Sequence, residues 1–477
     1  MSERIEADLC VIGAGSGGLV VAAGAAQLGL KTVLFESRRM GGDCLNFGCV
    51  PSKALLAAAK RMQAARENAE FGLRGALPTV DFPAVMDHVH RVIAAIEPND
   101  SQTRFEGLGV RVIRAHGRFV GPDEIEAGGT RIKAWRIVIA AGSAPAVPPI
   151  PGLDSVPYLT NETLFENRTL PRHLIVLGGG PVGIEMAQAH RLLGAEVTVL
   201  EALPRILTHD DPELASLLAE RLVAAGVRIR TNVRIRRVER DAANIAVVLE
   251  AESGEERVVG SHLLVAAGRR ANFGALDLEK AGIELEANGA LRLDRRLRTT
   301  NRRVYAVGDA AGGPQFTHAA NYQAGIVLRN ILFRLPAKVD YRALPAVTYT
   351  EPELAQVGLS ESAAVERFGA DLRILRWPLH ENDRAQTERR TRGLIKVLTR
   401  GNGRILGASI LAPEAGELIQ PWVLAVSRGL KIGAIATMIV PYPTLGEIGK
   451  RAAGRFYLPK LMSERTKWLV RKLRGLG

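Results

Sequence analysis

Cysteine is scarce in this chain, with three among 477 residues, and aromatic residues make up only 5%. Three cysteines cannot form the dense disulfide framework of a small secreted protein. No apolar run approaches the ~20 residues that cross a bilayer as a helix. The start, MSERIEADLCVIGAG, enters a strand-like run almost at once and predicts no signal peptide. We therefore expect a cytoplasmic globular protein, in which a close cysteine pair is catalytic or metal-binding.

Negative charge is also in short supply, since 50 Asp and Glu face 63 Lys and Arg, which gives a net charge of +13. The basic residues are spread widely and no nucleic-acid-binding motif accompanies them. The charge alone therefore does not indicate a nucleic-acid partner. The densest basic run is residues 455–477, with seven basic residues against one acid, Glu464.

Apolar residues in this basic tail recur at helical spacing: Leu461, Met462, Trp468, Leu469, Leu473 and Leu476. Two interpretations stay open. The tail is either an interfacial helix attracted to anionic lipid, or a helix packed on the protein's own dimer with a solvated basic face. We favour the second.

Glycine, by contrast, is grouped into two similar turns. In residues 7–36 an apolar strand runs into Gly13, Gly15 and Gly18, then an Ala-rich helix, and a second strand ends at Glu36. Such glycines let the backbone approach a pyrophosphate at a helix N-terminus. The acid stands where a carboxylate binds ribose hydroxyls. The segment predicts a dinucleotide site.

The same pattern returns in residues 174–201, with Gly178, Gly180 and Gly183 in the turn and Glu201 at the end of the second strand. Two units indicate two dinucleotides, most simply a flavin and a nicotinamide. Glu201 favours the free 2′-hydroxyl of NAD(H) over the phosphate of NADP(H), although Arg205 nearby could soften that preference.

Strands around the second unit suggest that one domain is inserted into another. The segments RIVIAAG (136–142) and HLLVAAG (262–268) are strands with the same Ala-Ala-Gly ending, at Gly142 and Gly268. Downstream, YAVGDAAG places Gly308 and Asp309 after a strand, where the Asp can bind a ribityl hydroxyl or simply cap a helix.

Two of the three cysteines, Cys44 and Cys49, stand in GGDCLNFGCVPSK, residues 41–53. Five residues of regular helix advance about 7.5 Å, more than the usual ~7 Å limit between the Cα atoms of a disulfide. If the two pair, the chain there must be distorted or only entering a helix. A structural pair or half a metal site are the alternatives, but only Cys10 remains as a further thiolate for zinc. No metal site is expected.

This segment resembles the redox-disulfide motif of the class I pyridine nucleotide–disulfide oxidoreductases, and the two glycine turns and YAVGDA extend the resemblance along nearly the whole chain. The family includes lipoamide dehydrogenase, glutathione reductase and mercuric reductase. The resemblance implies that Cys49 is the thiol beside the flavin and Cys44 the interchange thiol that faces the substrate. It also implies that Lys53 lies near flavin N5, paired with Glu185.

The resemblance further implies a homodimer that contains FAD and NAD(H), with NADP(H) a less favoured donor. The implied FAD-contacting residues are Gly13, Gly15, Gly18, Glu36, Gly42, Gly142, Gly308, Asp309 and His318. Those implied for NAD are Gly178, Gly180, Gly183, Glu201 and Gly268. The expected fold is α/β, with two Rossmann-like domains and a C-terminal α+β dimerisation domain.

The domain bounds follow from these motifs. We expect an FAD-binding domain in residues 1–150 and 268–338, an NAD-binding domain in 151–267, and an interface domain in 339–477 that carries the basic tail.

One segment departs from the family pattern. Disulfide-reducing members carry a histidine five residues before a glutamate, whereas VPYPTLGEIGK has Tyr442 before Glu447. A tyrosine with a pKa near 10 is a poor base at neutral pH, which argues against efficient dithiol oxidation. Mercuric reductase also has tyrosine here, but no cysteine follows Cys49 to supply that family's C-terminal pair.

Three functions therefore compete. The first is an NAD(P)H-dependent flavin reductase of a disulfide or thiol-bound soft metal. The second is a dihydrolipoamide dehydrogenase of a multienzyme complex. The third is an NADH:quinone-type dehydrogenase at the inner membrane face, with the tail as its peripheral membrane contact.

Overall fold

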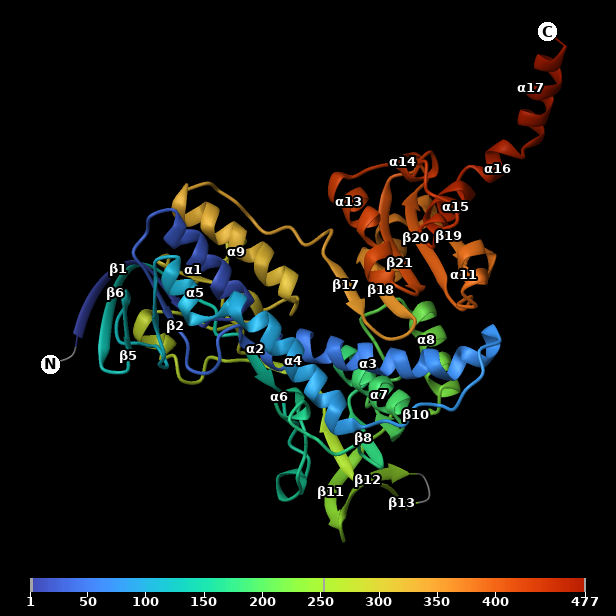
Figure 1. Cartoon of the computed structure of the whole chain (residues 1–477). Helices are drawn as coiled ribbons and strands as arrows, with labels where there is room; N and C mark the ends of the chain where they lie inside the picture. Colours follow the sequence, from blue (N-terminus) through green and yellow to red (C-terminus); the bar gives the residue numbers. More distant parts are fainter. Residues whose placement is uncertain (1–2, 252–253, 476–477) are drawn as a thin grey trace. The chain divides into compact units, whose positions relative to one another are not determined.

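The computed structural model describes residues 3–251 and 254–475 of the chain. It divides into two compact units (Figure 1). The first joins Met1–Leu200 to Val233–Val339, and the second joins Glu201–Asn232 to Asp340–Gly477.

The central sheet of the first unit is mostly parallel. Its parallel strands follow the order β3, β2, β1, β6, with β16 beside the end of β6, and antiparallel β5 and β4 extend the other edge. Their bounds are β1 Glu3–Ile12, β2 Thr32–Phe35, β3 Val110–Ile113, β4 Arg118–Phe119, β5 Glu124–Ala127, β6 Thr130–Ile139 and β16 Val304–Ala306.

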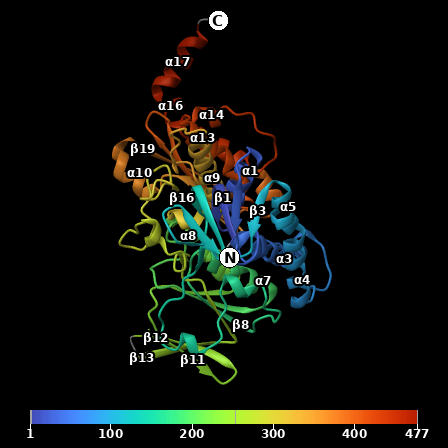
Figure 2. The same cartoon turned by 90° about the vertical axis from the view of Figure 1, so that its left-hand side faces the viewer.

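Both faces of this sheet are covered, as a parallel sheet requires. Along β1, Leu9 and Val11 face a core shared with two helices, while Cys10 and Ile12 face a second core on the other side. The two helices are α1, Ser16–Gln27, and α9, Thr317–Leu332, which pack side by side (Figure 2). The third cysteine is thus a core residue.

Helices α2 and α3 come after the first glycine turn and strand β2 in the chain. Helix α3 packs against α4 and α7. The bounds of the remaining helices of this unit are α2 Gly42–Asn46, α3 Cys49–Glu67, α4 Phe82–Asp100, α5 Gln102–Gly107, α6 Asn161–Leu164 and α7 Pro181–Leu193.

A smaller parallel arrangement carries the second glycine turn, with β8 between β9 and β14. An antiparallel meander, β11–β12–β13, packs on its apolar face through Val247 and Ile175. Strands β7 and β15 form a two-stranded link. The bounds are β7 Ser143–Pro145, β8 His173–Leu177, β9 Glu196–Leu200, β11 Ile235–Asp241, β12 Asn244–Ala251, β13 Gly254–Gly260, β14 His262–Val265 and β15 Arg269–Ala271.

The second unit is built on a five-stranded antiparallel sheet, in the order β17–β18–β21–β20–β19. The strands of this sheet are β17 Pro345–Thr348, β18 Glu353–Gly358, β19 Leu372–Pro378, β20 Leu394–Arg400 and β21 Ile405–Ala412. Strand β10, Val227–Arg230, is not part of this sheet. The helices are α8 Pro212–Ala224, α10 Glu361–Phe368, α11 Asp383–Thr387, α12 Ala415–Leu418, α13 Gln420–Arg428, α14 Gly433–Ala436, α15 Glu447–Arg455, α16 Leu458–Leu461 and α17 Glu464–Arg474.

The α/β class expected from the sequence is confirmed by these sheets and helices. Among the described residues, none of the helices has the length and apolar character needed to cross a membrane. Leu476, which we placed in the basic tail, lies outside the described residues.

Candidate functional site

The first glycine turn joins β1 to α1 and is shaped by close backbone packing. Gly13 has φ +109°, and a Cβ there would lie 2.3 Å from the carbonyl oxygen of Ala140. A Cβ on Gly18 would lie 1.9 Å from the Gly13 oxygen, so neither position accepts a side chain. For Gly15 the nearest atom is the Gly42 Cα at 4.0 Å. The middle glycine therefore leaves open space at the helix N-terminus, which fits a pyrophosphate.

Glu36 stands directly after β2 and is buried. Its carboxylate accepts the backbone N–H of Ala14 at 2.8 Å and of Arg38 at 2.6 Å. These bonds hold the acid beside the turn, where a ribose would lie.

The second turn repeats this geometry. Gly178 has φ +111° and its Cβ would lie 2.4 Å from the Ala266 oxygen, while a Cβ on Gly183 would lie 2.1 Å from the Gly178 oxygen. Nothing lies within 4 Å of the Cβ direction of Gly180. The same three-glycine arrangement therefore leaves a second open cradle at the N-terminus of α7.

In the second unit, Glu201 follows β9 in the chain, and its carboxylate accepts the N–H of Leu203 at 2.8 Å. Arg205 is engaged as well. Its guanidinium donates to the carbonyls of Leu207 and Thr208, both at 2.6 Å, and of Ile206 and Asp210 at longer distances. This arginine is therefore committed to the backbone rather than to a phosphate.

The cysteine pair spans a break between two helices. Cys44 lies in α2, Gly48 interrupts the helical backbone, and Cys49 is the first residue of α3. The chain there is thus entering a helix, which is one of the two arrangements that pairing requires. The thiolate of a cysteine in this position is stabilised by the helix dipole.

The surroundings make the two thiols unequal. The pKa of Cys49 is lowered to about 6, first by a hydrogen bond from Cys44 and then by the Thr317 hydroxyl and the Lys53 charge, against the effect of burial. The Thr317 Oγ1 lies 3.3 Å from the Cys49 Sγ. The pKa of Cys44 is raised, because it donates that hydrogen bond and is partly buried. These surroundings favour the thiolate at Cys49 and the thiol at Cys44.

Lys53 lies one helical turn beyond Cys49 on α3. Its ammonium donates to the Glu185 Oε2 of α7 at 2.8 Å, and the Glu185 side chain is only 5% exposed. A buried carboxylate requires such a partner. The ion pair fixes a positive charge close to Cys49.

A polar cluster lies next to the cysteines, and Asp309 is the only one of its residues that we expected at the site from the sequence. Arg269 Nη2 lies 3.2 Å from Asp43 and its Nε 3.5 Å from Asp309. Ser143 donates to Asp309, and Asn161 donates to Asp43 at 2.9 Å. Burial raises the pKa of Asp43, although Arg269 opposes this.

A sequence signal for two of these residues did exist. Ser143 and Arg269 each follow an Ala-Ala-Gly strand ending, at Gly142 with φ +67° and Gly268 with φ +128°. The two segments then pair as β7 and β15. Nothing local in the sequence marks Asp43 or Asn161.

Helix α9 begins at Thr317, so its N-terminal end lies at the cysteine pair. His318 stacks on Phe316, with ring centroids 5.1 Å apart. Gly308, with φ +68°, donates its N–H to Gln323 of the same helix at 2.7 Å. The segment around Asp309 is thereby tied to α9.

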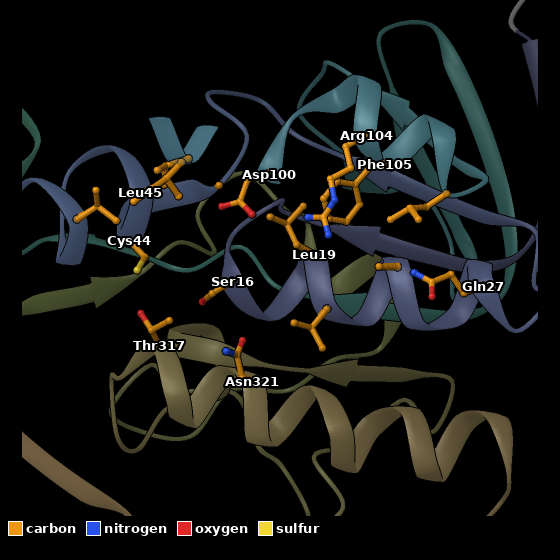
Figure 3. Close-up of a pocket in the computed structure, with 16 residues that line it drawn as sticks. Ser16, Leu19, Gln27, Cys44, Leu45, Asp100, Arg104, Phe105, Thr317 and Asn321 are labelled. Atoms are coloured by element: carbon orange, nitrogen blue, oxygen red, sulfur yellow. The ribbon is translucent and has the colours of Figure 1, made fainter. Parts of the chain in front are cut away.

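A cavity of about 380 Å³ opens beside Cys44, as Figure 3 shows. Cys44, Ser16 and Thr317 lie at one end of it, and Arg104, Phe105 and Gln27 at the other. Most of the remaining lining is apolar. A small molecule that enters this cavity can reach the Cys44 sulfur.

Tyr442 and Glu447 lie in the second unit, each with a partner of its own. The Tyr442 side chain is exposed, and its hydroxyl donates to the Asp383 Oδ2 at 2.8 Å. That bond raises the pKa of Tyr442. Glu447 forms an ion pair with Arg451 at 2.8 Å. The phenol is therefore a proton donor and not a base at neutral pH.

Comparison with known proteins finds two family profiles. The one described as pyridine nucleotide-disulphide oxidoreductase matches residues 7–324, and that of the same family's dimerisation domain matches residues 344–453. A mercuric reductase of Streptomyces lividans is 36% identical over 456 residues, which cover 94% of this chain and 96% of the relative. A dihydrolipoyl dehydrogenase of Bacillus subtilis (strain 168) is 35% identical over 456 residues, which again cover 94% of this chain and 96% of the relative.

Solved structures give the same result. The Cu(II) complex of the HOCl-induced flavoprotein disulfide reductase RclA from Escherichia coli has a TM-score of 0.84 and 28% identity, and covers 93% of this chain and 98% of its own. LpdA from Mycobacterium tuberculosis has a TM-score of 0.86 and 28% identity, and the match covers 95% of this chain and 99% of LpdA.

Proposed function

Because this chain belongs to the pyridine nucleotide-disulphide oxidoreductase family, we propose that it carries electrons from NADH to the Cys44–Cys49 pair and on to a thiol-bound soft metal or a disulfide. The family is FAD-dependent with NAD(P)H as the donor. Bound FAD supplies the two-electron relay between the nicotinamide and the cysteines. The two open glycine cradles fit two dinucleotides.

In this proposal the different pKa values of the two thiols determine which cysteine faces the flavin and which attacks the acceptor. Cys49 is held as a thiolate by Cys44, Thr317 and Lys53, so it takes the inner position. Cys44 borders the cavity and attacks the acceptor. For a disulfide acceptor, NADH and one proton yield NAD⁺ and two thiols. For Hg(II), NADH yields NAD⁺, one proton and metallic mercury.

The observation that carries the choice of acceptor is Tyr442. Its hydroxyl is bound to Asp383 and its pKa is raised, so the segment that supplies a base in disulfide-reducing relatives supplies none here. Reduction of a soft metal held by thiolates needs no such base. The mercuric reductase relatives and the Cu(II) complex of RclA support this choice.

A second candidate is dihydrolipoamide dehydrogenase, because relatives of that name match over the same share of the chain. It would oxidise a dithiol with NAD⁺ in the reverse direction. Its turnover depends on deprotonation of the incoming dithiol, which is the step that Tyr442 serves poorly.

NADH is the proposed donor rather than NADPH. Glu201 would repel a 2′-phosphate, and Arg205 donates to four backbone carbonyls instead of standing free to bind one. We also propose a homodimer, which the dimerisation-domain match supports. The four-part division at residues 150, 267 and 338 stays a prediction.

A screen of NADH oxidation tests the proposal. Holoenzyme is given Hg(II) or Cu(II) with excess thiol, lipoamide, or glutathione disulfide, and wild type is compared with Cys44→Ser. We expect fast metal-dependent oxidation that Cys44→Ser abolishes, and slow lipoamide turnover. Cys10→Ala, in the core and away from the site, is the matched control and should keep the wild-type rates. Rapid lipoamide turnover would instead establish the second candidate.

A further inference from the structure

The C-terminal end of the second unit forms a helix that is not packed against the sheet of that unit. After α15, the chain continues through α16 to α17, which leads away from the five-stranded sheet (Figure 1). None of the residues of α17 is buried. The dimerisation-domain profile ends at residue 453, so this helix lies beyond the part that the family profile covers.

One side of α17 is apolar. Leu469, Val470 and Leu473, which we call the apolar stripe, are 46%, 59% and 56% exposed. Their spacing of one, three and four residues places them on a single side of the helix. Such exposure of three neighbouring aliphatic side chains is costly in water and indicates a surface that another phase or molecule covers.

The basic residues of α17 border this stripe. At 100° per residue, Arg465 and Lys472 lie on one flank of it and Lys467 and Arg474 on the other. Glu464 is the only acid of the helix and is paired with Lys467 at 2.8 Å. Trp468 stacks with Lys472, whose Nζ lies 5.3 Å from the ring centroid. The helix thus combines an apolar side with positive charge along both edges.

We infer that α17 docks the enzyme on an anionic membrane surface and lies in the plane of the headgroups. The apolar stripe enters the acyl boundary, while the flanking Lys and Arg contact lipid phosphates and carboxylates. This inference does not depend on the electron acceptor proposed above.

Charge and apolar surface together favour a membrane over two other binding partners of α17, a second copy of the chain and a nucleic acid. Two copies of α17 packed against each other would bring their basic flanks together with one acid each, so like charge opposes burial of α17 against its own copy. A nucleic acid would satisfy the basic residues but offers no apolar layer for Leu469 and Leu473. An anionic bilayer supplies both.

Vesicle sedimentation of the full-length holoenzyme tests the inference. The probes are vesicles of phosphatidylcholine alone and of phosphatidylcholine with 30% phosphatidylserine. One variant replaces Arg465, Lys467, Lys472 and Arg474 with Gln, and another carries Leu469→Ser and Leu473→Ser. The matched control replaces four exposed arginines elsewhere with Gln: Arg61, Arg66, Arg74 and Arg428.

We expect wild type and the control to sediment with the anionic vesicles and to be released by 1 M salt. Both tail variants should bind at least about tenfold more weakly. Equal binding to the neutral vesicles, or full binding by either tail variant, would overturn the inference. So would a tail variant that dissociates to monomers in light scattering, which would assign α17 to the dimer. Binding of duplex DNA that survives the two Ser substitutions would assign it to nucleic acid.

NADH oxidation without vesicles provides the remaining control. Neither tail variant touches the cysteine pair, so each should retain the wild-type rate. A loss of vesicle binding with unchanged turnover supports the inference whichever acceptor the enzyme proves to use.

Discussion

At the scale of single residues, two identical side chains differ because of what surrounds them. Cys49 begins a helix and receives hydrogen bonds from Cys44 and Thr317, with the Lys53 charge nearby, so its pKa falls to about 6. A depressed pKa means that the thiolate persists above about pH 6 and is lost as the pH falls through that value. The rate of Cys49 alkylation in the reduced protein should therefore rise through pH 6 and level off above it.

The largest contribution to that pKa can be removed with one substitution. Cys44→Ala deletes the donor and should raise the pKa of Cys49 by about one to two, because a hydrogen bond to a charged group is worth ~1.5–3 kcal/mol. Cys44→Ser keeps a donor and should leave the pKa close to that of wild type. The measurement is the iodoacetamide rate against pH, with Cys49 as the only exposed cysteine left. Superimposable profiles for the two variants would contradict this account of the pair.

Tyr442 gives a second test at this scale. Tyr442→His restores an imidazole whose pKa lies near neutrality, and it should raise lipoamide-dependent NADH oxidation about tenfold or more. Tyr442→Phe, which only deletes the bond to Asp383, is the control and should give no gain. If the histidine variant is no faster than the phenylalanine variant, lack of a base does not limit dithiol chemistry here.

At the scale of elements, each glycine turn contains glycines that are needed for close packing and a middle glycine that leaves space for a ligand. Gly180 has open space at its Cβ and φ −76°, so Gly180→Ala should leave thermal stability unchanged. The added methyl occupies the cradle, and the KM for NADH should rise about tenfold. Gly183→Ala is the contrasting variant, since its Cβ would meet the Gly178 oxygen at 2.1 Å, and it should lower the melting temperature. A stable Gly180→Ala protein with wild-type KM would show that no pyrophosphate lies there.

Within the second unit, a buried cation joins α8 to the sheet. Lys396 of β20, whose side chain is 3% exposed, donates to Asp211 and Glu361, both at 2.8 Å, and pairs with Glu213 at 2.7 Å. Lys396→Met would leave the buried Asp211 carboxylate without its partner and should lower the free energy of unfolding by about 3–5 kcal/mol.

Urea unfolding would measure this loss. The comparison variant is Arg376→Met, whose half-exposed guanidinium pairs with Glu213 and should contribute less than about 1 kcal/mol. Equal effects of the two substitutions would mean that burial does not determine the strength of this cluster.

These elements also show how far the sequence alone reaches. Both strand–glycine–helix turns could be predicted because their signal is local, and the break between α2 and α3 was one of two arrangements that the cysteine spacing allowed. The contact between Cys49 and Thr317 joins residues 268 apart, and that between Lys396 and Asp211 joins residues 185 apart. Neither carries a local pattern. Lys53 and Glu185 were anticipated only through the family resemblance.

At the scale of the whole molecule, the cysteine pair lies in the first unit, and the Tyr442 segment and the basic helix α17 lie in the second. The apolar stripe of α17 and the basic residues on both its flanks change our preference for the tail from dimer packing to a lipid surface, because an anionic bilayer accommodates both. The proposal for the electron acceptor and the inference of membrane binding do not depend on each other, and each is tested by its own experiment.

In the proposed reaction, electrons from NADH reach Cys44 and Cys49. The most direct measurement is an anaerobic titration of oxidised holoenzyme with one equivalent of NADH, followed by alkylation and mass spectrometry. We expect both cysteines to become alkylated in proportion to the NADH consumed, while Cys10 stays unmodified in the core. Consumption of NADH with no new thiol at Cys44 or Cys49 would contradict it.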